Sequence, residues 1–161
     1  MHRLPRQPGP RYAALLEVLR AAEALWNASR VFFSRWDLSP SQFNVLNLLR
    51  DEPAGLSQTD LSRRLIMHRS NLTGLVDRLE ERGLVARRER AADRRAWEVV
   101  LTPGGRHLLE RILPRYYRVA EEACNGLAPA RARSLAVELR RLGAHAGELA
   151  EHLEESHDRQ S

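Results

Sequence analysis

The sequence predicts a mainly α-helical fold that carries one small β-hairpin. Apolar residues recur at helical spacing along most of the chain, and the segments 84–90 and 96–102 have the pattern of two short strands around a five-residue tip, 91–95. A chain of 161 residues with 43% apolar and 29% charged residues is long and apolar enough to bury a core of its own. We therefore expect one compact domain.

The first predicted helix carries a seam of mostly apolar residues at alternating spacings of four and three. The residues on this seam are Leu15, Leu19, Ala22, Trp26, Ser29, Phe33 and Trp36. Such spacing is typical of helices that pack side by side, as in coiled coils. Asp37 and Leu38 are expected to end the helix.

The next two helices are predicted from their start signals. Ser39 and Gln42 have the spacing of a capping box, with Pro40 at the first helical position. Ser57 and Asp60 repeat this pattern at the start of a third, shorter helix. Each serine should accept a hydrogen bond from the backbone three residues further on, which fixes where its helix begins.

A fourth helix has four apolar residues on one face, namely Leu72, Leu75, Val76 and Leu79. It should end at Gly83, because glycine readily takes the left-handed conformation that stops a helix. Two short helices joined by a tight turn form a helix-turn-helix. Since the hairpin follows directly, we interpret the block as a winged helix-turn-helix.

After the hairpin, Thr102 and Pro103 supply the cap and first residue of a fifth helix. It should run to about Cys124 and bend near Pro114, whose missing N–H interrupts the hydrogen-bond ladder. The last helix begins near Pro129 and again has a seam at spacings of four and three. Its members are Leu135, Leu139, Leu142, Ala146, Leu149 and Leu153.

Positive charge is concentrated in one segment. Residues 63–95 hold ten arginines and five acidic residues, a balance of +5 that equals the formal charge of the whole chain. From residue 144 onwards the chain is instead acidic. A localised positive surface favours an anionic partner such as nucleic acid.

The outward face of the fourth helix is a candidate DNA-reading surface. In a helix-turn-helix the second helix enters the major groove, and residues near its start reach the base edges. Arg69, Ser70, Thr73 and Gly74 are expected to face outwards. Arg69 is suited to a bidentate contact with guanine, and the two hydroxyls to base or phosphate contacts. The alternative is that this face is ordinary solvated polar surface.

The predicted hairpin tip carries Asp93, Arg94 and Arg95. Two arginines on a protruding tip are well placed to enter the minor groove or to grip phosphates. A carboxylate at such a tip costs affinity by its charge. We therefore expect Asp93 to orient a neighbouring arginine through a charge-assisted hydrogen bond.

Three more arginines, Arg87, Arg88 and Arg90, lie in the first strand of the hairpin. They are candidates for additional phosphate contacts. The alternative for each of them is pairing with Glu89 and Glu98 within the hairpin. The sequence does not decide between these roles.

Four motifs resemble the MarR (multiple antibiotic resistance regulator) family of transcription factors. They are SNLTGLVDRLE at 70–80, GLV at 83–85, DRR at 93–95 and LTPGG at 101–105, in that order and spacing. The helical layout on both sides is similar too, so the resemblance covers most of the chain. It implies a homodimer whose first and last helices interdigitate, with two recognition helices in successive major grooves of a pseudo-palindromic double-stranded DNA. It also implies that Arg95 enters the minor groove and that Asp93 orients it.

Residues and resemblance together give a division of the chain. We expect an N-terminal dimerisation helix over 1–36, a winged helix-turn-helix DNA-binding module over 37–102 and C-terminal dimerisation helices over 103–161. The candidate DNA-binding residues are Arg69, Ser70, Asn71, Thr73, Gly74, Arg87, Asp93, Arg94 and Arg95.

The resemblance also implies an effector. Members of this family commonly lose DNA affinity when a small molecule, often a phenolic or other aromatic acid, binds between the dimer helices and the DNA module. The candidate ligand-binding residues here are Trp26, Arg30, Phe33, His68 and Tyr116, with Tyr117 beside the last. An arginine among aromatic rings is suited to a carboxylate. The alternative is that the aromatics are dimer core, Arg30 a surface charge and His68 a tolerated polar residue.

Other classes of function find little support. We see no nucleophile–base pattern and no glycine-rich phosphate loop, so we expect neither an enzyme nor a cofactor. His145 and His152 are seven residues apart without a supporting cluster, so no metal site is predicted. The single cysteine, Cys124, is expected to pack in the interior, although a redox-responsive regulator is an alternative. With no signal peptide and no membrane-spanning run, we expect a cytoplasmic protein.

The leading hypothesis is thus a homodimeric transcriptional repressor that a small ligand releases from DNA. The alternative from another class is a winged-helix protein-interaction module that does not bind DNA. Such a module would present an apolar patch on the fourth helix.

Overall fold

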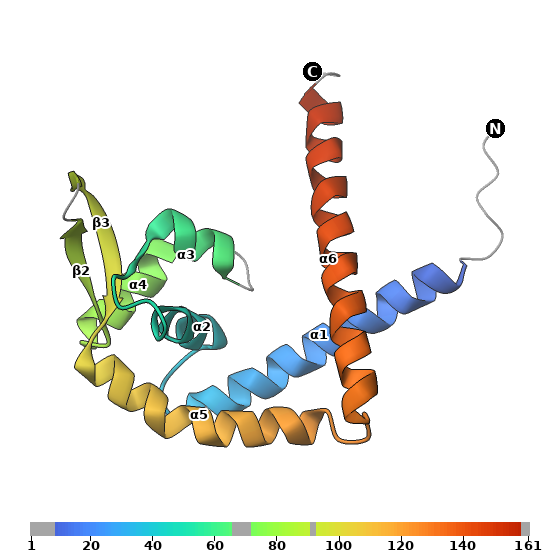
Figure 1. Cartoon of the computed structure of the whole chain (residues 1–161), viewed down its shortest axis with the longest axis horizontal. Coiled ribbons are helices and arrows are strands. Elements are labelled where there is room, and N and C mark those ends of the chain that lie inside the picture. Colours follow the sequence, from blue (N-terminus) through green and yellow to red (C-terminus); the bar gives the residue numbers. More distant parts are fainter. Residues whose placement is uncertain (1–8, 66–71, 91–92, 159–161) are drawn as a thin grey trace. The chain divides into compact units, whose positions relative to one another are not determined.

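A computed structural model describes residues 9–65, 72–90 and 93–158 of the protein (Figure 1). In chain order the elements are α1 Pro10–Ser34, α2 Pro40–Leu49, β1 Leu56–Ser57, α3 Gln58–Arg64, α4 Leu72–Glu81, β2 Val85–Arg90, β3 Asp93–Leu101, α5 Pro103–Ala123 and α6 Pro129–Asp158. The fold is mainly helical with a small sheet, as the sequence predicted. In the described parts of the chain, no helix has the length and apolar character needed to cross a membrane.

Contacts divide the chain into two compact units, Met1–Pro114 and Arg115–Ser161. The first unit contains α1 to the first half of α5, and the second contains the rest of α5 together with α6. The boundary falls at Pro114, which lies inside α5. The sequence predicts one compact domain instead, and the division by role at 36/37 and 102/103 stays a prediction.

The predicted start signals of α2 and α3 are both present. Gln42 N donates to Ser39 Oγ at 3.1 Å, and Ser39 N donates to Gln42 Oε1 at 2.8 Å, which completes the capping box of α2. In α3, Asp60 N donates to Ser57 Oγ at 3.1 Å. The Ser57 hydroxyl in turn donates to the Asp60 carboxylate at 2.6 Å, so one hydroxyl bonds both backbone and side chain of the aspartate.

The sheet has three antiparallel strands in the order β1-β3-β2, one strand more than the predicted hairpin. In β1, Leu56 pairs with Val99 and Ser57 pairs with Glu98. A strand of two residues shows no alternation of side chains, so the sequence could not reveal it.

The tip of the hairpin is shorter than predicted. β3 begins at Asp93 and not at Ala96, and Asp93 already pairs with Arg90. The predicted five-residue tip is therefore wrong, because backbone pairing extends into a polar run that has no apolar alternation. The register shifts between Glu89 and Arg90, as at a β-bulge.

The core of the first unit is formed by the end of α1, by α2 to α4, by the sheet and by the first half of α5. Its fully buried side chains include Phe33, Phe43, Leu46, Leu49, Leu61, Leu79, Val99, Leu109 and Ile112. The rings of Phe33 and Phe43 stack with centroids 4.2 Å apart. At Gly105 a Cβ would overlap the carbonyl oxygen of Leu84 and lie 2.7 Å from Leu101 Cδ1, so the first turn of α5 packs directly on the base of the hairpin.

Large apolar side chains are exposed on the two long helices. They include Tyr12, Leu15, Leu19, Leu25 and Val31 of α1, and Leu135, Val137, Leu139, Leu142, Leu149 and Leu153 of α6. Phe33, which the sequence placed on the first seam, belongs to the core. Cys124 is exposed, contrary to the expected interior packing, because it follows the last residue of α5 in a turn that buries none of its described side chains.

Candidate nucleic-acid interface

Helix α4 turns apolar residues inward and polar residues outward, as predicted. Leu72, Val76 and Leu79 are buried, whereas Leu75, the fourth apolar residue expected on this face, is partly exposed. Thr73 is exposed and Gly74 is partly exposed. The helix ends at Glu81, and Gly83, two residues later, takes the expected left-handed conformation with a φ of 66°. Of the two described candidates, Thr73 therefore presents a polar side chain on the outward surface, and Gly74 is accessible there without a side chain.

The remaining candidates on the helix and wing are placed only in part. Arg69, Ser70 and Asn71 lie outside the described residues. The backbone of Asp93, Arg94 and Arg95 belongs to β3, immediately after the tip. The strand that carries these three residues lies in the same unit as α4.

Arg87 connects the wing to helix α4. Its backbone N–H donates to Glu80 Oε1 at 2.8 Å, and its guanidinium pairs with Asp77 Oδ1 at 2.5 Å and with Glu80 Oε2. The arginine side chain is 26% exposed. Both partners are carboxylates of α4. The Arg87 side chain therefore takes a role that differs from the two roles expected from the sequence, a phosphate contact or pairing with Glu89 and Glu98 within the hairpin.

This cluster holds the Arg87 charge in place. The hydrogen bond to Asp77 is the largest cause that raises the pKa of the guanidinium above its ordinary value. Partial burial acts in the opposite direction, and the hydrogen bond to Glu80 adds to the rise. Because one cation faces two carboxylates, much of its positive potential is compensated within the protein.

Two further arginines of the basic segment also bond within the chain. Arg88 donates to the carbonyl oxygen of Ala54 at 2.9 Å, and Arg64 pairs with Glu52 at 2.7 Å. Arg64 is thus partly compensated by a carboxylate outside residues 63–95, whereas Arg88 bonds a neutral carbonyl and keeps its full charge.

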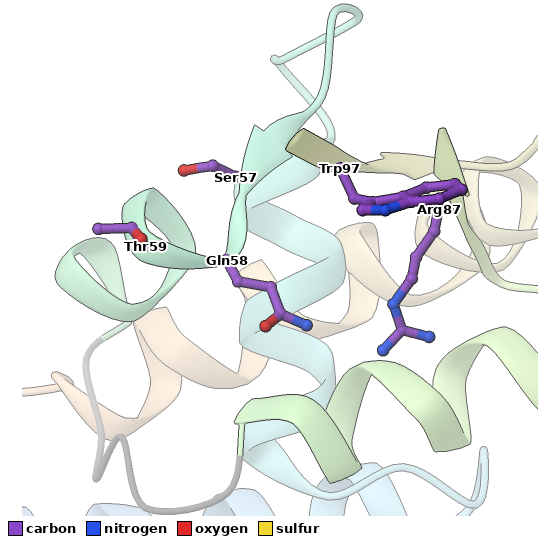
Figure 2. Close-up of a pocket in the computed structure, with 5 residues that line it drawn as sticks. All are labelled: Ser57, Gln58, Thr59, Arg87 and Trp97. Carbon is purple, nitrogen blue, oxygen red and sulfur yellow. The ribbon is translucent and has the colours of Figure 1, made fainter. Parts of the chain in front are cut away.

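An open hollow lies between the start of α3 and the wing (Figure 2). Its lining residues are Ser57, Gln58, Thr59, Arg87 and Trp97. Figure 2 shows the Trp97 ring beside the Arg87 side chain and the Gln58 amide extending into the same space. Trp97 is 51% exposed, whereas Val99 on the same face of β3 is 1% exposed. Sequence reasoning missed Gln58 and Thr59 because they belong to no motif, and it took Trp97 only as a strand residue.

The candidate ligand-binding residues lie in different environments. Trp26 is partly exposed and Arg30 is exposed on α1, whereas Phe33 is 2% exposed in the core. Tyr116 is partly exposed and belongs to the second unit. His68 lies outside the described residues. Within the described ranges, no three His, Cys, Asp or Glu side chains gather in a way that could hold a metal ion.

We expect Arg87 and Glu80 to be energetically coupled. Arg87→Met and Glu80→Gln, made singly and together, should give a coupling of about 1 kcal/mol in the free energy of unfolding by urea. Added salt should reduce this coupling, because the pair is only partly buried. Arg20 and Glu17, whose side chains are both 70% exposed, form a control pair that should couple by less than about 0.5 kcal/mol. Equal coupling in the two pairs would contradict the role assigned to Arg87.

Comparison with known proteins agrees with this geometry. Residues 36–96 match the model of the MarR family. YkoM of Bacillus subtilis (strain 168), an HTH-type transcriptional regulator, is 32% identical over 112 residues, which cover 69% of this chain and 71% of that protein. Alignments with other curated relatives cover as little as 52% of their length, about half.

Solved structures show similarity to regulators of the same kind over more of the chain. Sco3205 of Streptomyces coelicolor, a MarR family transcriptional regulator in complex with DNA, has a TM-score of 0.77 and 26% identity, with 90% of this chain and 92% of that chain covered. BpsR of Bordetella bronchiseptica has a TM-score of 0.74 and 28% identity, with 87% and 98% covered. From its capped helix-turn-helix to its wing and flanking helices, the chain belongs to the MarR family of winged helix-turn-helix transcriptional regulators.

Proposed function

We propose that the protein is a homodimeric repressor that binds a pseudo-palindromic operator and is released from it by a small aromatic acid. The observation that carries the proposal is the arrangement of α4 and the wing. The outward face of α4 is polar, and Arg87 of the wing bonds Asp77 and Glu80 of the same helix. A rigid pair of this kind can engage a major groove and the neighbouring backbone or minor groove together. Sco3205, whose fold is similar, was solved in complex with DNA.

In this proposal the start of α4 reads bases and the wing adds affinity. The residues proposed to contact the major groove are Thr73 and Gly74 on α4, together with Arg69, Ser70 and Asn71, which precede the helix in the sequence. Side chains at the start of a recognition helix reach base edges, and glycine permits close approach of the backbone.

The wing residues take different roles. Arg94 and Arg95, at the start of β3, contact phosphates and the minor groove, and Asp93 orients Arg95. Arg87 is in our proposal a support for the wing, because its guanidinium already faces Asp77 and Glu80.

The homodimer is supported by the exposed leucines of α1 and α6. Patches of large apolar side chains are rare on the surface of monomers and mark interaction sites. A protein-interaction module without DNA binding would instead need an apolar patch on α4. The described residues of α4 include no exposed large hydrophobic side chain, which favours the DNA-binding function.

The proposed effector is a small aromatic acid. In the structurally similar BpsR, DNA binding is regulated by 6-hydroxynicotinic acid, an aromatic acid. Arg30 and Trp26 on α1 are the described residues of this chain best suited to such a ligand, because a guanidinium binds a carboxylate and an indole stacks on a ring.

Arg95→Ala should weaken operator binding by about 1 to 3 kcal/mol, because one arginine contact to DNA is lost. Arg69→Ala should in addition relax the preference for one base of the operator. Fluorescence anisotropy on DNA fragments selected from the source genome measures both effects. Wild-type affinity in the first variant, or unchanged base discrimination in the second, would count against these roles.

Leu149→Glu combined with Leu153→Glu should give a monomer with much weaker operator binding, because two half-sites are no longer engaged together. These side chains are 60% and 62% exposed in the single chain. Arg141→Gln, on an exposed and locally paired residue of α6, serves as control. Sedimentation velocity reports the assembly state, and a dimer in the double variant would refute the interface. Removal of residues 1–36 would not test the interface in isolation, because it also removes Phe33 from the core.

A screen of small aromatic carboxylates for release of bound DNA tests the effector. In Arg30→Ala the concentration needed for half release, referred to the variant's own DNA affinity, should rise at least about tenfold, because a charge-assisted contact to the carboxylate is lost. An unchanged concentration would remove Arg30 from the site.

A further inference from the structure

Helix α1 ends in a Schellman motif built around an unusual residue. Leu38 N donates to Phe33 O at 3.3 Å, and Asp37 N donates to Ser34 O at 2.9 Å. Asp37 takes a φ of 53°, the left-handed conformation that this motif requires and that glycine usually fills. The carbonyl groups of Trp36 and Asp37 then follow the last turn of the helix.

Helix α4 ends in the same way. Leu84 N donates to Leu79 O at 2.9 Å, and Gly83 N donates to Glu80 O at 2.8 Å. Arg82 stands immediately before the left-handed Gly83. The C-terminal end of the proposed recognition helix is therefore as sharply defined as that of α1.

The Arg82 side chain links these two helix ends. Its Nη2 donates to Trp36 O at 3.0 Å and its Nη1 donates to Asp37 O. The two carbonyl groups lie 45 and 46 residues away in the sequence but in the same unit. The Asp37 carboxylate, 98% exposed and 4.0 Å away, contributes little by comparison.

The chemistry of this contact is favourable. Carbonyl groups at the C-terminal end of a helix carry partial negative charge, and a guanidinium there is stabilising. Its rigid fork of donors can bond two neighbouring carbonyls at once, which an ammonium group does less well. The Arg82 side chain is 32% exposed, so these bonds are only partly screened by water.

The surroundings of Arg82 are partly open. A hollow lies beside it, lined by Asp37, Ser39, Gln42, Arg78, Glu81 and Arg82. Helix α2 packs on both α1 and α4. Arg82 therefore adds a direct bond between two helices that α2 also links by packing.

We propose that Arg82 is a positioning residue for DNA reading, because it fixes the orientation of α4 relative to α1. The inference rests on the proposed function, in which α1 contributes to the dimer and α4 reads DNA. The spacing of two recognition helices in a dimer then depends on this contact, although the guanidinium bonds the protein backbone and not DNA.

The test compares Arg82→Ala, Arg82→Lys and the control Arg20→Ala, an exposed arginine of α1 paired locally with Glu17. Operator affinity should fall about tenfold in Arg82→Ala and at least about threefold in Arg82→Lys, which keeps the charge but not the fork. The control should bind like wild type. The dependence of log affinity on log salt should keep its slope in both Arg82 variants, whereas a lost phosphate contact lowers it by about one.

Hydrogen exchange supplies a readout that does not depend on DNA. The amides of Asp37 and Leu38 should exchange faster in both Arg82 variants. Any of three results in the Arg82 variants would overturn the proposal. These are unchanged amide exchange at Asp37 and Leu38, operator affinity equal to wild type, and a slope of log affinity against log salt that is lowered by about one. Wild-type protein that binds no operator refutes the proposed function instead, and exchange then still decides whether Arg82 joins the helices. If Arg82→Ala fails to fold, Arg82→Lys carries the same comparison.

Discussion

A ribbon of two strands is marginally stable in water, so the position of the wing depends on what holds it. Pairing of Leu56 with Val99 adds a third strand, and the first turn of α5 packs at Gly105 on the carbonyl of Leu84. Both contacts fix the base of the hairpin. The cluster around Arg87 is different because it joins the wing to α4, the proposed recognition helix, through one side chain.

Several arginines of the basic segment, residues 63–95, form bonds within the protein. Arg64, Arg82, Arg87 and Arg88 bond to carboxylates or carbonyls of the protein itself. These bonds fix the positions of the side chains, and only the bonds to carboxylates also compensate positive charge.

Local signals in the sequence predicted local structure well. The capping box of α2, the serine cap of α3, the prolines at helix starts and the left-handed Gly83 after α4 depend on residues within one turn of one another, and the helices begin and end at or next to these signals. Strand β1 and the early start of β3 at Asp93 escaped prediction, because backbone pairing across the sheet leaves no periodic trace in so few residues. For the candidate site, helical spacing was enough to predict that Thr73 and Gly74 face outward. The partners of Arg87 and Arg82 could not be predicted, because they lie on segments that are distant in the sequence and meet only in the folded chain.

Helix α6 runs for 30 residues, yet none of its described side chains is buried within the chain. Isolated helices draw little stability from propensity alone, and this one carries a row of leucines to solvent. In the proposed homodimer a second molecule would cover these leucines and stabilise the helix, so that helix formation and association would be linked. The abundance of the protein in the cell would then act as a regulatory variable of its own, because dilution would both weaken the helix and separate the paired binding sites.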